Sequence, residues 1–372
     1  MNKRVLFTAT VDSHILHFHL PYIKWFKEQG FEVHVASRGG GEIPFADVKH
    51  EILFERSPFK LPNIKAYRQL KKIIEENDYT LIHCHTPVGG VLTRLAARNA
   101  RKKGTKVLYT AHGFHFFKGA PLRNWLLYYP LEKWLARYTE CLITINEEDY
   151  QRAIKGNFKA GTIKKVDGVG IDLTRFKPVE EGEKNNLRQK YGYKENDFIL
   201  ICVGELNANK HQDLLIKAVK VLKYRIPEVK LLLVGTGKLE NKYKRMAKKL
   251  GVEEHVHFLG YRNDVPDLMA IADAALSASK REGLPVNIME AMATGLPLVV
   301  TDCRGSRDLV EDGENGFVVG VDDVRGIAEA VEKIYWSEEI KEKFRANNLE
   351  KIKSYSLNII KKEMVGVYMT CL

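Results

Sequence analysis

The feature that most constrains this chain is a repeated alternation of short apolar runs with amphipathic helical stretches. The apolar runs are continuous and do not alternate with polar residues, which is typical of strands buried on both faces. In the first half we expect strands at Arg4–Thr10, Glu32–Ser37, Leu81–His85, Lys106–Ala111 and Cys141–Ile145. In the second half we expect them at Phe198–Val203, Lys230–Val234, Val256–Leu259, Ala274–Ser277, Leu298–Thr301 and Gly316–Val319. The pattern predicts an α/β fold with parallel sheets covered by helices.

Helical patterns fill the gaps between these runs and indicate two doubly wound α/β units. In the first half they lie near Leu20–Gln29, Asn63–Glu76, Val88–Lys103, Leu122–Tyr138 and Glu147–Lys155. A length of 372 residues is also about twice that of an ordinary domain. Residues 178–186 are polar and lack periodicity, which predicts a linker. We therefore expect an N-terminal domain at 1–177, a linker at 178–186, a C-terminal domain at 187–354 and a C-terminal helix at 355–372.

The basic charge is concentrated in the first half of the chain. The formal net charge is +12, and residues 1–180 hold 29 Lys and Arg against 18 Asp and Glu. A one-sided positive field suits nucleic acid, a lipid surface or a phosphorylated substrate. A merely solubilising surface is the alternative. Because no DNA- or RNA-binding module or stacking motif accompanies the charge, we expect no nucleic-acid partner.

Apolar runs and cysteines indicate the compartment. No run reaches the ~20 apolar residues of a membrane-spanning helix. The run Val5–Val11, closed by Asp12, predicts a buried strand and not a signal peptide. The five cysteines are scattered without a C-x-x-C pair, and four lie in or beside apolar runs. This usage favours a reducing cytoplasm.

The densest chemical signal is the segment from Arg281 to Glu290. Glu282 follows an expected strand, and Pro285 suits the first turn of a helix because its missing N–H needs no partner there. The amides that follow can face an anion with the helix dipole behind them. Glu290 lies on the first turns of that helix and can hold a sugar diol. An ordinary strand-to-helix loop with a dipole-favoured Glu is the alternative.

Two further residues follow expected strands. Lys210 stands at a helix start, where a cation opposes the dipole, so we expect a compensating anion such as a bound phosphate. An exposed lysine without a partner is the alternative. His112 directly follows the strand Lys106–Ala111, and Gly113 permits a sharp turn, so the imidazole is expected to face a cleft. A core histidine is the alternative.

Two weaker patterns carry little weight. The histidines at 14, 17, 19, 83 and 85 lack acidic partners and a recognisable ligand spacing, so we expect no metal site. Gly235-Thr236-Gly237 lacks a third glycine and is a weak dinucleotide signature.

Together these elements resemble glycosyltransferase family 4, whose retaining members use nucleotide sugars and have two facing Rossmann-like domains, the GT-B fold, with the active site in the cleft. Glu282 and Glu290 fit its E-x7-E motif, and Lys210 fits its phosphate-binding lysine. The segment 168–176 fits the family segment that ends the first domain, and the segment 259–265 fits the one that packs along the nucleobase. The segments 12–21, 83–90 and 112–117 resemble the branch that makes bacterial capsular polysaccharides and exopolysaccharides.

The chain departs from the family pattern at two places. Glu205 stands where the family has a diphosphate-binding arginine, and Arg281, Arg262 or Arg304 could replace its charge. The glycine-rich loop after the first strand is also absent, since Asp12-Ser13-His14 follows Val11 directly. The acceptor contacts that this loop makes in relatives are therefore in doubt.

The resemblance implies transfer of a sugar, an N-acetylhexosamine or a hexose, from a UDP-sugar to a polyprenyl-diphosphate-linked saccharide, without a metal or other cofactor. It implies acceptor binding by the first domain and nucleotide-sugar binding by the second. We expect the C-terminal helix at 355–372 to pack back on the first domain. The catalytic candidates are His112, Lys210 and Glu282. The donor-binding candidates are Ser13, Glu205, Asn207, Tyr261, Arg262, Gly283, Leu284, Pro285, Val286, Asn287 and Glu290.

The aromatic and basic segment Phe114–Tyr138 suits a surface at the level of lipid headgroups. We therefore expect a peripheral protein at the inner face of the cell membrane, bound to anionic lipid; a purely structural core is the alternative. The rival activities are a UDP-sugar epimerase of the same architecture and a dehydrogenase, for which the dinucleotide signature is missing.

Overall fold

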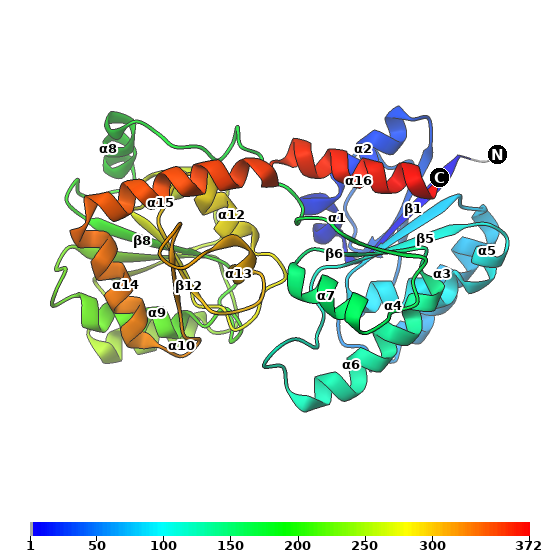
Figure 1. Cartoon of the computed structure of the whole chain (residues 1–372), viewed down its shortest axis with the longest axis horizontal. Helices are drawn as coiled ribbons and strands as arrows, with labels where there is room; N and C mark the ends of the chain where they lie inside the picture. The colour runs from blue at the N-terminus through cyan, green and yellow to red at the C-terminus, as the bar shows by residue number, and fades with distance from the viewer. Residues whose placement is uncertain (1–2) are drawn as a thin grey trace. The chain divides into compact units, whose positions relative to one another are not determined.

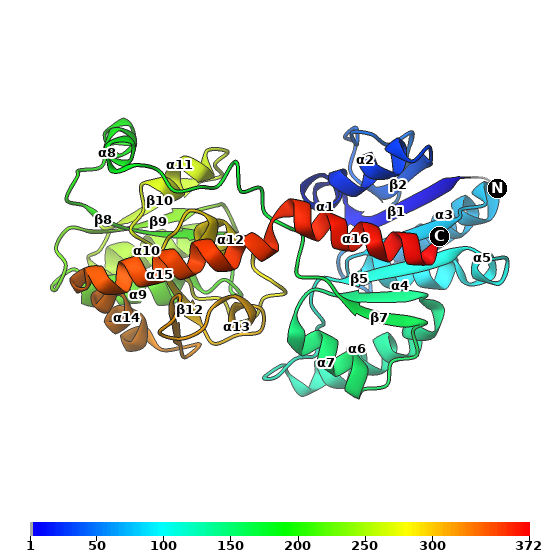
Figure 2. The same cartoon turned by 45° about the horizontal axis from the view of Figure 1, so that its top comes forward.

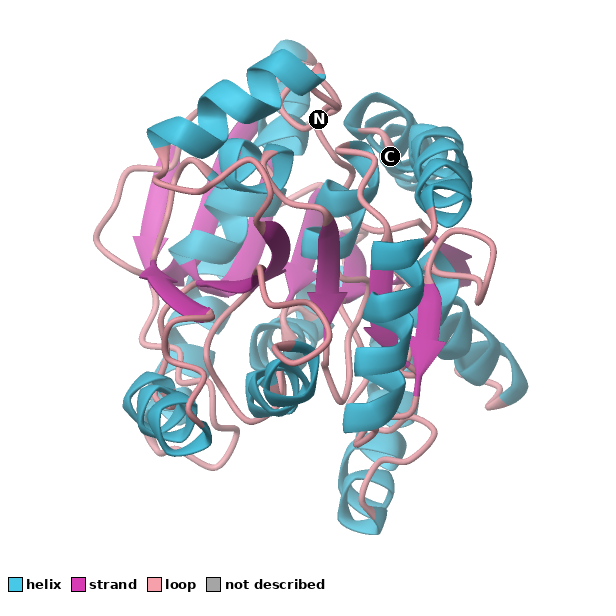
Figure 3. Cartoon of the chain, turned by 90° about the vertical axis from the view of Figure 1, so that its left-hand side faces the viewer, coloured by secondary structure: helices cyan, strands magenta, loops and turns pink. Residues whose placement is uncertain are grey.

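The computed structural model describes residues 3–372 and divides into two compact units. The first unit contains the residues up to Val169 together with Ile360–Leu372, and the second contains Gly170–Ile359. Each unit is built on one wholly parallel sheet. Helices flank the strands in Figures 1 and 3. The predicted pair of Rossmann-like α/β domains is confirmed.

The first sheet has seven strands in the order β3-β2-β1-β4-β5-β6-β7. Its strand order reverses between β1 and β4, where ligands bind in folds of this type. The strands are β1 (Arg4–Val11), β2 (Glu32–Arg38), β3 (Val48–Glu51), β4 (Leu81–His85), β5 (Lys106–Ala111), β6 (Cys141–Thr144) and β7 (Thr162–Lys165).

The helices of the first unit include one that the sequence analysis did not predict, α1, directly after β1. The expected helix Val88–Lys103 is divided at Ala97 into α4 and α5. The helices are α1 (Asp12–Phe18), α2 (Leu20–Glu28), α3 (Pro62–Asn77), α4 (Pro87–Ala96), α5 (Arg98–Lys102), α6 (Leu122–Leu135), η1 (Ala136–Tyr138) and α7 (Glu147–Lys155).

The second sheet has six strands in the order β10-β9-β8-β11-β12-β13, all of them predicted. Its order reverses between β8 and β11. The strands are β8 (Phe198–Val203), β9 (Val229–Val234), β10 (Val256–Gly260), β11 (Ala274–Ser277), β12 (Leu298–Thr301) and β13 (Phe317–Val319). The helices are α8 (Glu181–Lys190), α9 (Gln212–Leu222), α10 (Glu240–Leu250), α11 (Val265–Ala270), α12 (Val286–Ala293), α13 (Ser306–Leu309), α14 (Val324–Trp336), α15 (Glu338–Lys351) and η2 (Ile352–Tyr355).

The predicted linker at 178–186 is partly wrong, because α8 begins at Glu181. Acidic residues in its first turn and basic residues in its last turn favour a helix through the dipole, although its apolar content is low. Its Arg188 is buried and donates two hydrogen bonds to Asp273 at 2.7 and 2.8 Å. Tertiary ion pairing thus anchors a helix that has no apolar stripe.

The final helix, α16 (Leu357–Cys371), contributes most of its length to the first unit. Its Ile360, Met364 and Tyr368 join the core that covers β1 and β2. The Tyr368 ring stacks on Trp25 of α2 at 5.9 Å, and its hydroxyl lies 2.8 Å from His83 Nδ1. In Figure 2 this red helix runs beside the blue strand β1.

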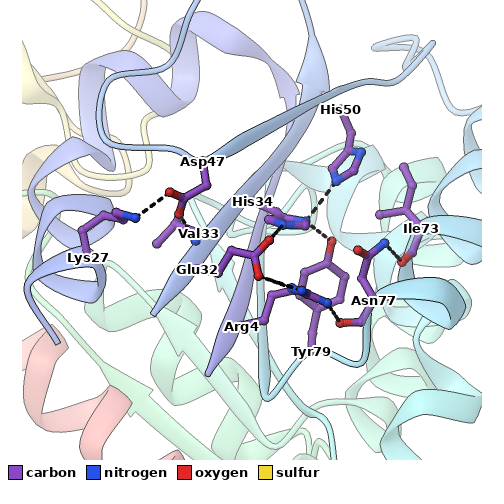
Figure 4. Close-up of polar contacts among 10 residues, drawn as sticks. All are labelled: Arg4, Lys27, Glu32, Val33, His34, Asp47, His50, Ile73, Asn77 and Tyr79. Atoms are coloured by element: carbon purple, nitrogen blue, oxygen red, sulfur yellow. Dashed lines mark hydrogen bonds and ion pairs between the residues drawn. The ribbon is translucent and has the colours of Figure 1, made fainter. Parts of the chain in front are cut away.

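A polar network closes the end of the first sheet away from the ligand edge (Figure 4). Arg4 donates to Glu32 Oε2 at 2.7 Å, and Glu32 Oε1 lies 2.8 Å from His34 Nε2. The other ring nitrogen of His34 lies 2.6 Å from the Tyr79 hydroxyl and 3.1 Å from His50 Nε2. Every ring nitrogen of His34 therefore has a partner, and the network serves the fold.

Among residues 3–372 no helix is long and apolar enough to span a membrane.

Candidate active-site residues

The predicted residues of the second unit gather where its strand order reverses. The loop after β8 carries Lys210, and the loop after β11 carries Glu282, so both lie at the carboxyl ends of the two central strands. Lys210 Nζ lies 2.7 Å from Glu282 Oε1. The two side chains are mostly buried, with exposed fractions of 21% and 13%. In the structure, the carboxylate of Glu282 is an anion beside Lys210.

Short-range contacts fix the position of Lys210. Asn207 Oδ1 accepts hydrogen bonds from the backbone amides of Asn209 and Lys210, both at 2.9 Å, which closes a tight Asx turn. The Lys210 stem passes over Gly204, where a Cβ would lie 3.3 Å from its Cε. The sequence therefore presents the ammonium at the sheet edge through a local turn.

The loop that carries Glu282 is held by two neighbouring loops. Asn209 Nδ2 donates to the carbonyl of Arg281 at 3.1 Å, and the buried Arg304 donates through Nε to the carbonyl of Glu282 at 2.8 Å. Gly305 has φ +80°, and a Cβ there would lie 2.4 Å from the Gly283 carbonyl oxygen. Only glycine permits this approach, so the loop after β12 fixes the loop after β11.

The weak glycine pattern after β9 also has a structural reason. A Cβ on Gly235 would lie 2.2 Å from the Gly204 carbonyl oxygen, and one on Gly237 would lie 2.3 Å from that of Leu206. These glycines let the loops after β8 and β9 pack against each other. They support the loop that bears Lys210, which explains the pattern without a dinucleotide.

The helix α12 begins beside this pair without a side-chain cap. Pro285 is its N-cap residue, and Leu284 and Pro285 are buried. The first amides of the helix, those of Val286 and Asn287, belong to the group that has no partner within a helix. Asn287 Nδ2 donates to the Val203 carbonyl at 3.0 Å, which ties the helix start to the end of β8. The arrangement can bind an anion next to Lys210.

Glu290 lies one helical turn further along α12. Burial raises the pKa of its carboxyl group from 4.5 to about 7, against the opposing charge of Arg175. Arg175 is itself held by a 3.4 Å hydrogen bond to the Asn263 carbonyl. A partly buried carboxyl group whose pKa is raised in this way is typical of a functional position.

The remaining predicted residues of the second unit are less constrained. Glu205 is exposed, and only its carbonyl is held, by Gln212 Nε2 at 3.0 Å. Tyr261 has 71% of its surface exposed. Arg262 donates two hydrogen bonds to Asp264, the longer at 2.8 Å, so its charge is already matched. Of the three candidates for the missing arginine, Arg262 is therefore the least suited.

In the first unit, His112 lies within a cluster of histidines at the carboxyl ends of β1, β4 and β5. His112 Nε2 is 3.2 Å from His14 Nε2 and 3.4 Å from His85 Nδ1, and its ring centroid is 5.8 Å from that of His19. Burial, with the neighbouring His14 and His83, lowers the pKa of His112 well below 6.5. The ring is therefore neutral at pH 7. Ser13, on α1 beside His14, has an exposed side chain.

A cavity of about 430 Å³ opens beside this cluster. His14, Gly113 and His115 line it together with residues of α4 and α6. Most of its wall is apolar, and Arg56 and Glu132 contribute charge. The nearby helix α6 exposes Leu122 and Leu126 with 72% and 68% of their surfaces in solvent.

The sequence analysis set aside His14, His19 and His85 as metal ligands and did not place them beside His112. Their spacing in the sequence resembles no ligand motif, because the four histidines, His112 included, come from three different strand ends. It also missed the role of Asn209 and considered Arg304 only as a charge. The signal that could have found the histidines was their position after predicted parallel strands, which end at one edge of the sheet.

Comparison with known proteins gives a consistent result. Residues 183–351 match the family described as glycosyl transferases group 1, and residues 4–146 match the one described as glycosyl transferase 4-like. EpsD of Bacillus subtilis (strain 168), a glycosyltransferase by name, is 49% identical over 368 residues, which cover 99% of this chain and 97% of EpsD.

Two further proteins extend the comparison. The UDP-Gal:alpha-D-GlcNAc-diphosphoundecaprenol alpha-1,3-galactosyltransferase of Escherichia coli is 30% identical over 278 residues, covering 74% of this chain and 71% of that protein. The crystal structure of Anabaena Alr3699/HepE in complex with UDP and glucose superposes with a TM-score of 0.80 at 21% identity, covering 99% of this chain and 100% of that one. At this identity the superposition shows a shared fold.

Proposed function

The chain belongs to glycosyltransferase family 4 and has the GT-B type of fold, and we propose that it is a retaining enzyme that transfers a sugar from a UDP-sugar to a saccharide carried on a polyprenyl diphosphate. The product belongs to capsule, exopolysaccharide or another surface glycan. The donor sugar is an N-acetylhexosamine or a hexose. The predicted location of the reaction between the two domains stays a prediction.

The pair formed by Lys210 and Glu282 at the start of α12 carries this proposal. In glycosyl transfer the bond between the anomeric carbon and the β-phosphate oxygen breaks, and negative charge grows on the departing UDP. Lys210 and the amides of Val286 and Asn287 are the groups that would meet this charge. Because they supply positive charge themselves, the proposed reaction needs no metal ion.

The other residues have roles around this pair. Glu282 would accept hydrogen bonds from hydroxyl groups of the donor sugar, and Glu290 from the ribose. His112 would contact the sugar from the first domain. Retention requires that the acceptor hydroxyl attack the anomeric carbon on the face that UDP leaves, so its proton can pass to the departing phosphate oxygen. Asn207, Asn209 and Arg304 act as positioning residues, because they hold the loops of Lys210 and Glu282.

The choice of UDP and of a lipid-linked acceptor is supported by relatives. The Anabaena structure contains UDP and glucose, and the Escherichia coli relative is named for UDP-Gal and a diphosphoundecaprenol acceptor. In this chain the 430 Å³ cavity in the first domain, with its apolar wall and its charged Arg56, suits an acceptor of mixed character. Exposed leucines of α6 next to basic residues favour contact with the inner membrane face, whose anionic lipids attract cations.

The test is a screen of UDP-sugars for binding and slow hydrolysis, followed by transfer to lipid-linked saccharides. We expect one UDP-sugar to bind and a product to form only when an acceptor is present. Conversion of the UDP-sugar to its epimer without an acceptor would instead assign the epimerase activity. Failure of all nucleotides to bind would refute the placement of the donor on the second domain.

A further inference from the structure

Four histidines of the first domain converge without the carboxylates or hydroxyls that usually satisfy buried imidazoles. His14 and His19 come from α1 and its end, His85 from the end of β4 and His112 from the loop after β5. One ring nitrogen of each lies within 4.8 Å of the corresponding nitrogen of every other. Since β1, β4 and β5 are neighbours in the sheet, the topology itself brings these side chains together.

Two of the distances match metal coordination. Four nitrogens at ~2.0–2.1 Å from a tetrahedral Zn²⁺ lie about 3.3–3.4 Å from one another. The separations His14 Nε2–His112 Nε2 and His112 Nε2–His85 Nδ1 are 3.2 and 3.4 Å. Other separations in the group extend up to 4.8 Å, so side chains of the cluster would shift to complete the set.

Two buried members of the cluster have ring nitrogens without a hydrogen-bond partner among the described residues. Among residues 3–372, neither ring nitrogen of His19 has a hydrogen-bond partner, nor does His85 Nε2. Their exposed fractions are 3% and 0%. The adjacent His83 is different, because its two ring nitrogens lie 2.8 Å from the Tyr368 and Thr110 hydroxyls. An unpaired buried polar atom costs ~1–3 kcal/mol, so the buried His19, with neither ring nitrogen partnered, points to a ligand beside the satisfied His83.

We propose that His14, His19, His85 and His112 bind one divalent transition-metal ion, with Zn²⁺ as the best match. Imidazole nitrogens suit Zn²⁺, Ni²⁺ and Cu²⁺, whereas Mg²⁺ and Ca²⁺ require oxygen ligands, which this group does not provide. His14 and His112 are partly exposed and provide the entry path. The sugar transfer does not require this ion, because Lys210 supplies the charge for it.

Occupancy has a consequence for the proposed reaction. An ion at this position engages the Nε2 of His112 and holds this side chain away from the donor sugar. Metal binding would thus lower transfer, and this consequence rests on the proposed function. The binding itself does not, because it is measured without any sugar substrate.

The experiment uses the full chain without an affinity tag, freed of metal with a chelator. Zn²⁺ is titrated in competition with a chromophoric chelator, and Co²⁺ reports the geometry through its visible absorption. We expect one Zn²⁺ per chain and the intense Co²⁺ absorption of a tetrahedral nitrogen site. His19→Ala should weaken binding by ~100-fold or more, since even loss of groups that only orient metal ligands costs 10–100-fold.

Two matched variants control for other histidines. His17 is an exposed residue of the same helix α1, and His50 belongs to the satisfied network of Figure 4. His17→Ala and His50→Ala should bind Zn²⁺ like the wild type. Should His19→Ala not fold, His14→Ala at its partly exposed position serves as the second variant. Equal affinity of the wild type and these cluster variants, or a weak octahedral Co²⁺ spectrum, would overturn the proposal.

Discussion

Replacement of Glu290 by glutamine should make the second domain less sensitive to pH. The side chains have nearly the same shape, but glutamine does not ionise. Burial raises the pKa of Glu290 from 4.5 to about 7, so the folded chain binds this proton more tightly than the unfolded chain does. The wild type therefore loses stability as pH rises from about 4.5 to about 7, and the variant lacks this loss.

The magnitude follows from the two pKa values. The ionisation of Glu290 costs the folded domain about 0.8 kcal/mol at pH 5 and about 3.3 kcal/mol at pH 8, from 1.36 kcal/mol per pKa unit. Between these pH values the stability of Glu290→Gln relative to the wild type should thus rise by about 2.5 kcal/mol. The quantity to measure is how the difference in unfolding free energy between Glu290→Gln and the wild type changes with pH. Any pH-independent effect of the glutamine amide on stability cancels in this change.

Amide hydrogen exchange across a urea series measures this effect. Peptides from β11 and β12 report the unfolding free energy of the second domain separately from that of the first. Glu253 is an exposed residue of the same domain, so Glu253→Gln is the matched control and should follow the wild type at both pH values. A difference between Glu290→Gln and the wild type that stays constant from pH 5 to pH 8 would refute the reasoning.

Other perturbations test the remaining parts of the site. Lys210→Ala should lower turnover at saturating donor by orders of magnitude, more than it weakens donor binding. Lys220→Ala, on the exposed face of α9, is the control and should leave turnover unchanged. Equal turnover of Lys210→Ala and the wild type would exclude Lys210 from stabilising the leaving group. Glu290→Ala should weaken UDP binding by ~1.5–3 kcal/mol in calorimetry, and unchanged affinity would remove it from the ribose. The protein should sediment with anionic vesicles at low salt and be released from them at high salt. The variant Leu126→Glu should bind the vesicles less. Equal recovery on neutral and anionic lipid would contradict the membrane proposal.

The sequence determined the fold class because a parallel strand buried on both faces leaves an unmistakable local pattern. All six strands of the second sheet and the five inner strands of the first were predicted. The two missed strands, β3 and β7, lie at the edges of the first sheet. They are short, polar and partly exposed, so the burial that makes an inner strand apolar does not act on them. The segment from Glu282 to Glu290 was equally legible, because one loop and one helix start carry it.

The tertiary structure decided which distant residues share a place. The ion pair of Lys210 and Glu282 joins positions 72 residues apart, and its partners could not be inferred from either loop alone. The pKa of Glu290 depends on what covers α12, and the histidine cluster depends on the order of β1, β4 and β5 in the sheet. Local sequence encodes where a strand ends and which side chain follows it. Only the packing of strands into a sheet decides which of those side chains meet and how much water remains around them.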